Sequence, residues 1–330
     1  MSNKTILKII SIVSLSCLPY LFSLRGDFVF DDSEAVVNNK DVTSEHWLNC
    51  FYNDFWGSDI SSNLSHKSYR PLTILTFRFN YFINAKKLSA FGFKSTNLVC
   101  HVLCTVLVYL SMNDMLNTMA HLGKNNVKGF DTSYIASLLF SVHPVHTEAV
   151  CGVVGRADLL AGTTFFLVII FYNKAMTNQN YRNLNLIVAM IIAGISLLFK
   201  ENGITVLGFC FFYDVIITVN FKSKWKHHKL NGFRINHFII RATVTFFSIV
   251  LFLYLRWTVM GSAKPTFSET DNPAAFSKDL FTRTLITGAS THSSAIPASF
   301  QYILPSWVCH SREDSLHPLR RLLSFCSYRI

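Results

Sequence analysis

The chain has 330 residues, half of them hydrophobic and 15% charged, and a formal net charge of +11. A soluble domain carries about a quarter of charged residues, so this composition excludes an ordinary water-soluble fold and predicts a polytopic membrane protein. The basic residues stand in short segments between apolar runs. A positive-inside bias explains that placement better than binding to nucleic acid, and no nucleic-acid partner is expected.

Seven apolar runs approach the length of a transmembrane helix, and they predict an all-α bundle. The third run is short before it meets the sequence HPVH. The first follows Lys4 and Lys8 and lacks a clear small-residue cleavage site, so it is predicted to be an uncleaved anchor. The predicted spans cover about 5–24, 95–115, 132–150, 157–173, 184–200, 203–220 and 237–256. The domain plan is a first transmembrane helix at 1–24, a loop at 25–94 and helices two to seven within 95–256.

Lysine and arginine lie mainly on one side of this topology. They fill the segment before the first span and the segments between spans two and three, four and five, and six and seven, which makes that side cytosolic. The opposite side receives 25–94, the 143–158 loop, the 200–202 hairpin and everything after 256. The unusual polar motifs all fall on this second side, so any chemistry is expected to face the lumen or the exterior.

The loop at 25–94 contains one further apolar segment, PLTILTFRFNYFI at 71–83. It is too short to cross a membrane, and as a helix it would place Leu72, Leu75, Phe79 and Phe82 on one face. This pattern favours a helix lying on the membrane surface, although FRFNYF also alternates like a strand. Asn63 begins a glycosylation sequon, which is compatible with a lumenal loop.

The C-terminal part differs from the rest of the sequence. Residues 257–284 form a further segment on the lumenal side, ending in the motif DNPAAF and a few residues more. Residues 285–330 contain no long apolar run and are rich in Ser and Pro, so they predict a divergent, disordered tail rather than an eighth span.

Asp31 and Asp32 are adjacent carboxylates just beyond the first span. One interpretation is a solvated turn or an N-cap for the following SEAVV. The other is a glycosyl-transfer site, in which one carboxylate takes the proton of an acceptor hydroxyl and its neighbour raises its pKa.

A lipid-phosphate sugar donor needs cations to hold its leaving phosphate, and arginine suits this because its planar fork binds two oxygens. For any single cation, snorkelling at the interface is the plainer alternative. Candidates on the lumenal side are Lys67, Arg70, Arg156, Lys200 and Arg256.

Two other polar motifs stand on that side. His143 and His146 with Glu148 resemble part of a metal site, but Pro144 disrupts the helix that would align them, so hydrogen bonding or substrate contact is favoured over metal ligation. Lys200, Glu201 and Asn202 form either a plain hairpin turn or a charged group retained for use near hydrocarbon.

Together these motifs carry a family resemblance that runs in order from about residue 22 to 284. The stretches are FVFDDSEAVVNNKDV, FYNDFWGS, SHKSYRPLTILTFRFNY, FSVHPVHTEAVCGVVGRADLLAG, KENGITVLGFCFFYD and RWTVMG with DNPAAFS. They resemble the transmembrane and tetratricopeptide-repeat-containing O-mannosyltransferases, which are endoplasmic reticulum membrane proteins of the GT-C class.

The resemblance implies an enzyme that moves mannose from dolichyl-phosphate mannose to Ser or Thr hydroxyls of lumenal acceptors, typically cadherin domains. It implies an inverting displacement with Asp31 as the base and Asp32 beside it, and neither metal nor cofactor. The N-terminus would be cytosolic and the site lumenal. Other candidates lie in matching motifs, with roles assigned by chemistry alone: Arg70, Arg156, Lys200 and Arg256 for the donor phosphate, and His143, His146, Glu148, Asp158 and Glu201 without a specific role.

The sequence departs from the family in two respects. It contains no 34-residue repeat, and the resemblance stops near Thr284, so a shortened form is expected. The alternative function is an inactive form that binds lipid-linked sugar or regulates a full-length enzyme. A seven-helix receptor is disfavoured by the predicted cytosolic N-terminus. A transporter is disfavoured because the charges gather at one membrane face instead of in mid-span.

Overall fold

We describe the chain from a computed structural model, which covers residues 3–63, 65–123, 131–224 and 232–261. Within those ranges the regular structure is helical, apart from one isolated bridge between Asn53 and Asp59. All of them lie in one compact unit, Met1–Pro273. The predicted segment 257–284 is described only as far as Gly261. The predicted tail lies outside the described residues, and so do residues 124–130 and 225–231, which belong to two of the basic segments.

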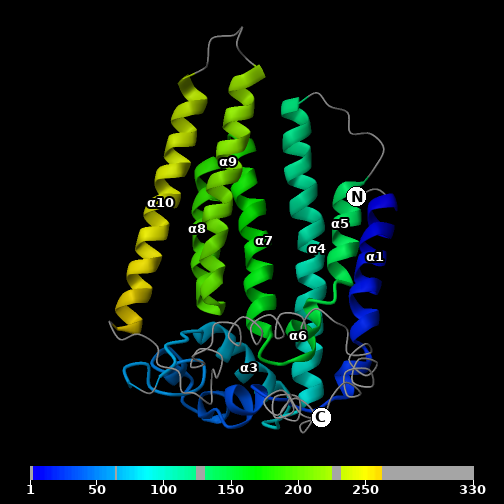
Figure 1. The fold of residues 1–330 in the computed structure, drawn as a ribbon, viewed down its shortest axis with the longest axis vertical. Coiled ribbons are helices and arrows are strands. Elements are labelled where there is room, and N and C mark those ends of the chain that lie inside the picture. Colours follow the sequence, from blue (N-terminus) through cyan, green and yellow to red (C-terminus); the bar gives the residue numbers. More distant parts are fainter. Residues whose placement is uncertain (1–2, 64, 124–130, 225–231, 262–330) are drawn as a thin grey trace, which may run out of the picture. The chain divides into compact units, whose positions relative to one another are not determined.

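Ten α-helices follow one another along these ranges (Figure 1). They are α1 (Asn3–Cys17), α2 (Lys40–Thr43), α3 (Pro71–Ile83), α4 (Ala90–Gly123), α5 (Thr132–Ser141), α6 (His146–Cys151), α7 (Arg156–Thr177), α8 (Arg182–Phe199), α9 (Thr205–Lys224) and α10 (Gly232–Met260). Short 3-10 turns are η1 (Leu18–Tyr20), η2 (Phe22–Arg25), η4 (Trp47–Phe51) and η5 (Glu201–Ile204), and η3 (Ser33–Val37) is a π-helical turn.

The prediction of an all-α polytopic membrane protein is confirmed. Five described segments are long and apolar enough to cross a membrane: Ala90–Ala120, Arg156–Thr177, Arg182–Phe199, Glu201–Thr218 and Ile235–Met260. The first and third predicted spans correspond to the shorter helices α1 and α5. Pro19 and Pro144 account for this, because proline removes a backbone donor and disturbs the preceding turn. After α1 the chain continues in 3-10 turns to Arg25, and α5 ends at Ser141, before the separate helix α6.

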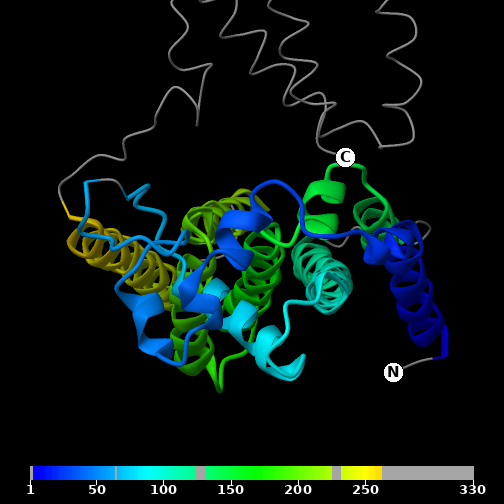
Figure 2. The ribbon, with the colours of Figure 1, turned by 90° about the horizontal axis from the view of Figure 1, so that it is seen from below.

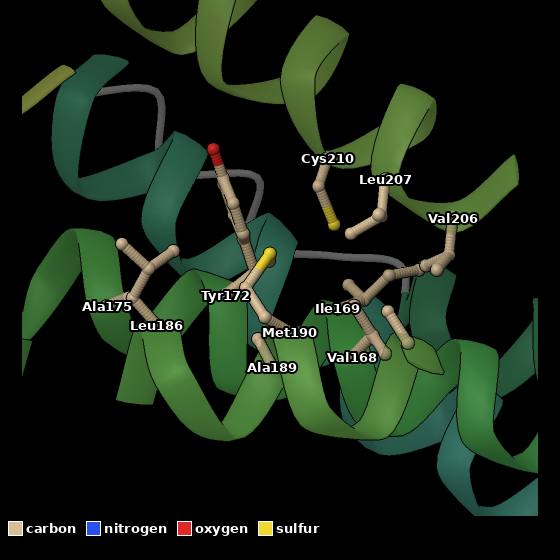
Figure 3. Packing of buried hydrophobic residues seen from close by; sticks show 11 residues of the cluster. Val168, Ile169, Tyr172, Ala175, Leu186, Ala189, Met190, Val206, Leu207 and Cys210 are labelled. Carbon is tan, nitrogen blue, oxygen red and sulfur yellow. The ribbon is translucent and has the colours of Figure 1, made fainter. Parts of the chain in front are cut away.

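The main transmembrane core lies where α7, α8 and α9 meet (Figure 3). Val168 and Tyr172 of α7 pack with Leu207 and Cys210 of α9, and all four are almost fully buried. Ala189 of α8 is also fully buried, and such small side chains let neighbouring helices approach closely.

The 25–94 loop and α6 cover one end of the bundle (Figures 1 and 2). They enclose a second core in which Val36, Phe55, Phe77, Phe93 and Val153 are fully buried. This core fixes the loop against the first residues of α4 and the segment before α7. The motifs predicted to be lumenal therefore gather over the same ends of the helices.

The helix at 71–83 is confirmed as α3, and the strand alternative is wrong. Its buried side includes Thr73, Ile74 and Phe77, while Phe79 and Phe82 on the predicted apolar face are exposed. A face of exposed apolar side chains on a helix at the end of a bundle favours contact with the membrane surface, which remains a prediction.

The interior of the bundle contains an ion pair that the sequence reading did not anticipate. Arg241 of α10 binds Asp214 of α9 through Nε at 2.7 Å and Nη2 at 2.9 Å, and the Tyr172 hydroxyl donates to Asp214 at 3.1 Å. Both charged residues lie within apolar segments. The interpretation that charges gather only at one membrane face is therefore wrong.

Candidate functional site

The acidic pair lies in a tight turn, Val29–Asp32, which we call the acidic turn. The Asp32 N–H closes it by donating to the Val29 carbonyl at 3.0 Å, and Phe30 and Asp31 occupy its two central positions. The neighbouring carboxylates have different surroundings, because Asp32 is 1% exposed whereas Asp31 is exposed to solvent. The two aspartates therefore have different physical roles.

Asp32 holds the acidic turn in place. Its Oδ2 accepts a hydrogen bond from the Val29 N–H at 3.1 Å, and its Oδ1 accepts one from the Val154 N–H at 2.9 Å. Hydrogen bonds from backbone amides to a carboxylate are charge-assisted and therefore strong. Asp32 thus joins the acidic turn to the segment just before α7, 122 residues further along the chain.

Asp31 has the properties of a proton acceptor. The surrounding protein removes part of its water, and the negative charges of Asp32 and then Glu148 repel its own, so the pKa of Asp31 is raised. Raising the pKa of a carboxylate makes it a stronger base, provided that it is ionised at the working pH. Sequence reasoning grouped Glu148 with the histidines; here its charge also acts on Asp31.

Arg156 is fully buried at the start of α7. Its Nε donates to Asn97 Oδ1 at 2.8 Å, Nη2 to the Phe93 carbonyl at 2.8 Å and Nη1 to the Thr76 carbonyl at 3.1 Å. The guanidinium also lies over the ring of Phe77 at 4.8 Å and the ring of Phe93 at 5.4 Å. Arg156 braces α3, α4 and α7 together, and a phosphate would have to displace these contacts to reach it.

Gly155 permits the close packing that positions α7. A Cβ at this residue would lie 2.5 Å from the Cα of Ala149 in α6, closer than real contacts allow. The absent side chain lets the backbone before α7 lie directly on α6. This contact fixes the start of α7, where Arg156 and Asp158 lie.

A second group, which we call the cationic network, consists of Arg70, Arg256, Lys200, Glu201 and Asp158. Arg70 binds Glu201 through Nε and Nη2, each at 2.9 Å, and Arg256 Nη2 binds the same carboxylate at 3.1 Å. Lys200 Nζ lies 2.6 Å from both carboxylate oxygens of Asp158. Arg70 precedes α3, Arg256 is near the end of α10, and Glu201 begins η5, so three distant parts of the chain meet at one carboxylate.

The segment before α7 connects the acidic turn with the cationic network. Val154 binds Asp32, and Asp158, four residues later, binds Lys200. Val154 lies two residues before α7 and Asp158 lies in its first turn, so both sets of contacts lie at the same end of α7. This arrangement can hold a general base and a group of cations on one side of the bundle.

The histidines form an aromatic cluster. The His146 ring lies 4.2 Å from that of Phe140, 5.5 Å from that of His101 and 6.0 Å from that of His143. His101 is fully buried and its Nε2 lies 3.2 Å from the Ser141 carbonyl. Burial, followed by the charges of His101 and His143, lowers the pKa of His146 to about 4, so this ring is neutral near pH 7. Among the described residues, no group of three or more His, Cys, Asp or Glu side chains could hold a metal ion.

Three further residues of the 25–94 loop and α6 have a defined place. Asn63, the start of the sequon, is exposed. Cys50 is buried and Cys151 half-buried, and both are free thiols in this structure.

Comparison with known proteins gives the family. Protein O-mannosyl-transferase TMTC4 of Homo sapiens is 36% identical over 313 residues, which is 89% of this chain and 41% of that protein. Protein O-mannosyl-transferase TMTC2 of Homo sapiens is 38% identical over 276 residues, 81% of this chain and 31% of that protein. By sequence, the chain belongs to the TMTC family. It spans about two fifths of the length of TMTC4. No family model and no solved structure matches the chain.

Sequence reasoning missed three features of this candidate site. Asn97, which orients Arg156, and His101, which packs on His146, are polar residues in the apolar run of α4, and such interruptions are a usable signal. The Val154 amide, which binds Asp32, left no signal, because every non-proline residue has a backbone N–H.

Proposed function

We propose that this chain contains the membrane-embedded catalytic module of a protein O-mannosyltransferase. The donor is dolichyl-phosphate mannose and the acceptors are Ser or Thr hydroxyls of lumenal proteins, with cadherin-type domains as the leading class. The membrane is that of the endoplasmic reticulum, with the N-terminus in the cytosol and the acidic turn in the lumen. The names of the TMTC relatives support the transferase class.

The contrast between Asp31 and Asp32 is the observation that carries this proposal. A transferase that activates a hydroxyl needs a carboxylate that substrate can reach, whose pKa is raised and whose position is fixed. Asp31 is exposed and its pKa is raised, while the buried Asp32 holds the turn by two backbone hydrogen bonds.

The proposed reaction is a single displacement. Asp31 accepts the proton of the acceptor hydroxyl as its oxygen forms a bond to the anomeric carbon of mannose. The bond from that carbon to the phosphate oxygen breaks, and its electron pair leaves with dolichyl phosphate. Attack opposite the leaving group inverts the configuration, so a β-linked donor yields an α-linked mannose.

The cationic network is the proposed phosphate site. Negative charge grows on the phosphate as it leaves, and guanidinium groups fixed in advance stabilise such charge. Arg70 and Arg256 converge within 3.1 Å of a single carboxylate, which shows that an anion can contact both. Lys200, which directly precedes Glu201 in the chain, adds a third cation to the network. Arg156 contributes differently, by holding α3 and α4 in place.

The test is mannose transfer from dolichyl-phosphate mannose to a cadherin-domain acceptor in microsomes that contain this chain. Asp31→Asn is expected to abolish transfer, because the amide cannot accept the hydroxyl proton. Glu34→Gln is the matched control, because Glu34 is an exposed carboxylate three residues away. It accepts a hydrogen bond from the neighbouring Asn38 side chain. Glycosylation at Asn63 reports that each variant has inserted with its loop in the lumen.

The outcomes separate the two candidate functions. Transfer that is lost in Asp31→Asn and retained in Glu34→Gln supports the enzyme. If the unmodified chain inserts normally and transfers no mannose, this chain is not a transferase by itself. The alternative, a binding or regulatory partner of a full-length enzyme, is then favoured.

A further inference from the structure

We propose that Glu201 competes with the donor phosphate for Arg70 and Arg256, and so promotes release of the lipid phosphate product. This inference rests on the proposed function, because it assigns a role to a residue within the proposed phosphate site. It identifies Glu201 as a positioning residue that acts through the two arginines.

Glu201 occupies the donors that a phosphate would use best. Arginine recognises phosphate through two parallel N–H groups on one edge of the guanidinium. On Arg70 the edge formed by Nε and Nη2 is bound to Glu201 Oε2, with both distances 2.9 Å. The face of the same guanidinium lies over the Phe55 ring at 4.9 Å, which limits approach from that side.

Arg256 is held by the other oxygen of the same carboxylate. Its Nη2 lies 3.1 Å from Glu201 Oε1, and the Arg256 side chain is 15% exposed. The Glu201 side chain is 30% exposed, so it can leave the arginines for water at a lower cost than a buried carboxylate would incur. A phosphate can therefore take the place of Glu201 while the arginines stay where they are.

The charges explain why such a competitor is useful. The donor phosphate carries one negative charge, and the released lipid phosphate, a monoester, carries about 1.5 to 2 at pH 7. Two arginines with no competing anion would therefore bind the product more tightly than the donor. A carboxylate that returns to the same guanidinium groups offsets this difference.

Lys200 provides a contrast within the same network. It is paired with Asp158 of α7, and within the described part of the chain the Glu201 carboxylate is bound by Arg70 and Arg256 instead. Removing the Glu201 charge is therefore expected to free the two arginines while the Lys200 pair stays intact. The substitution thus tests the arginine pair specifically.

The experiment measures binding of farnesyl phosphate, an isoprenyl monophosphate, to the full chain in detergent micelles. Glu201→Gln keeps the shape of the side chain and removes its charge, and the affinity for the probe is expected to rise about tenfold. Glu45→Gln is the matched control, because Glu45 also pairs with a cation, Lys86, and its side chain is 84% exposed. The control is expected to leave the affinity unchanged.

The results distinguish this inference from the proposed function. If neither the unmodified chain nor Glu201→Gln binds farnesyl phosphate, the lipid-phosphate donor is refuted, and the inference falls with it. If the chain binds the probe and Glu201→Gln leaves the affinity unchanged or weakens it, only the competing role is overturned. If Glu201→Gln does not fold, Glu201→Asp takes its place, because it keeps the charge on a shorter side chain. Its affinity for farnesyl phosphate is expected to rise less than tenfold. A fall in that affinity would overturn the inference.

In a preparation that transfers mannose, the kinetics of Glu201→Gln distinguish competition with phosphate from a purely structural role of Glu201. Competition predicts a lower KM for the donor together with a lower kcat, because product release slows. A Glu201 that only holds the arginines in position predicts a higher KM instead.

Discussion

Replacing Asp32 by Asn is expected to destabilise the fold far more than the same change at Asp31. The Asp32 carboxylate is buried and accepts hydrogen bonds from the backbone amides of Val29 and Val154. An Asn side chain has one oxygen acceptor, and its NH2 group would face the second amide. One buried N–H therefore loses its partner, and the remaining bond loses its charge assistance.

The magnitude follows from those two bonds. A hydrogen bond to a charged group contributes about 1.5–3 kcal/mol, and leaving a buried donor unsatisfied costs about 1–3 kcal/mol. The negative charge of Asp32 also acts favourably on the buried guanidinium of Arg156. We expect the free energy of unfolding to fall by about 3 kcal/mol for Asp32→Asn, within the range for loss of a buried polar contact.

The assay is thermal unfolding of both variants in detergent, followed by tryptophan fluorescence. For Asp32→Asn we expect the Tm to fall by roughly 4–6 °C, by the scaling for chains of this size. Asp31→Asn is expected to match or exceed the unmodified chain at neutral pH, because a raised pKa means that the fold disfavours the charged form of Asp31. That advantage should disappear as the pH falls below the pKa of Asp31, where the carboxyl is already neutral. Equal losses of stability in the two variants would refute the assignment of different roles.

Three further predictions follow from single features of the structure. Mannose transfer should fall as acid protonates Asp31, with a midpoint above the ordinary aspartate range because its pKa is raised; a pH–rate profile with no such limb above pH 4 contradicts this. Phe30 has a left-handed φ of 47°, which strains a bulky residue, so Phe30→Gly should raise the free energy of unfolding by about 1 kcal/mol, and a lower Tm would oppose that reading. Arg241→Leu should cost about 3–5 kcal/mol by leaving the Asp214 charge buried, and adding Asp214→Leu should restore much of it; unfolding of the single and double variants measures the recovery.

The transmembrane helices could be predicted because hydrophobic length is a local signal. The apolar runs of α7 to α10 locate these helices within about five residues of their observed ends, whereas α4 extends further than its predicted span at both ends. The third predicted span is interrupted for a local reason as well, because α5 ends at Ser141, shortly before Pro144. The Arg241–Asp214 pair could not be predicted in this way, because the two residues stand 27 positions apart and only the packing of α9 against α10 brings them together.

The residue types of the site were visible in the sequence, but their roles were not. Asp31 and Asp32 are chemically identical neighbours, and no pattern indicates which of them turns inward to the Val154 amide. Arg156 looks like Arg70 as a phosphate candidate, yet burial at 0% exposure and four described polar contacts give it the function of a brace. A charge in a sequence motif thus becomes a base, an anchor or a ligand only through what surrounds it. For this reason the Asp31 and Asp32 variants are most informative when stability and transfer are measured on the same preparation: loss of transfer with intact stability identifies the base, and loss of both identifies the anchor.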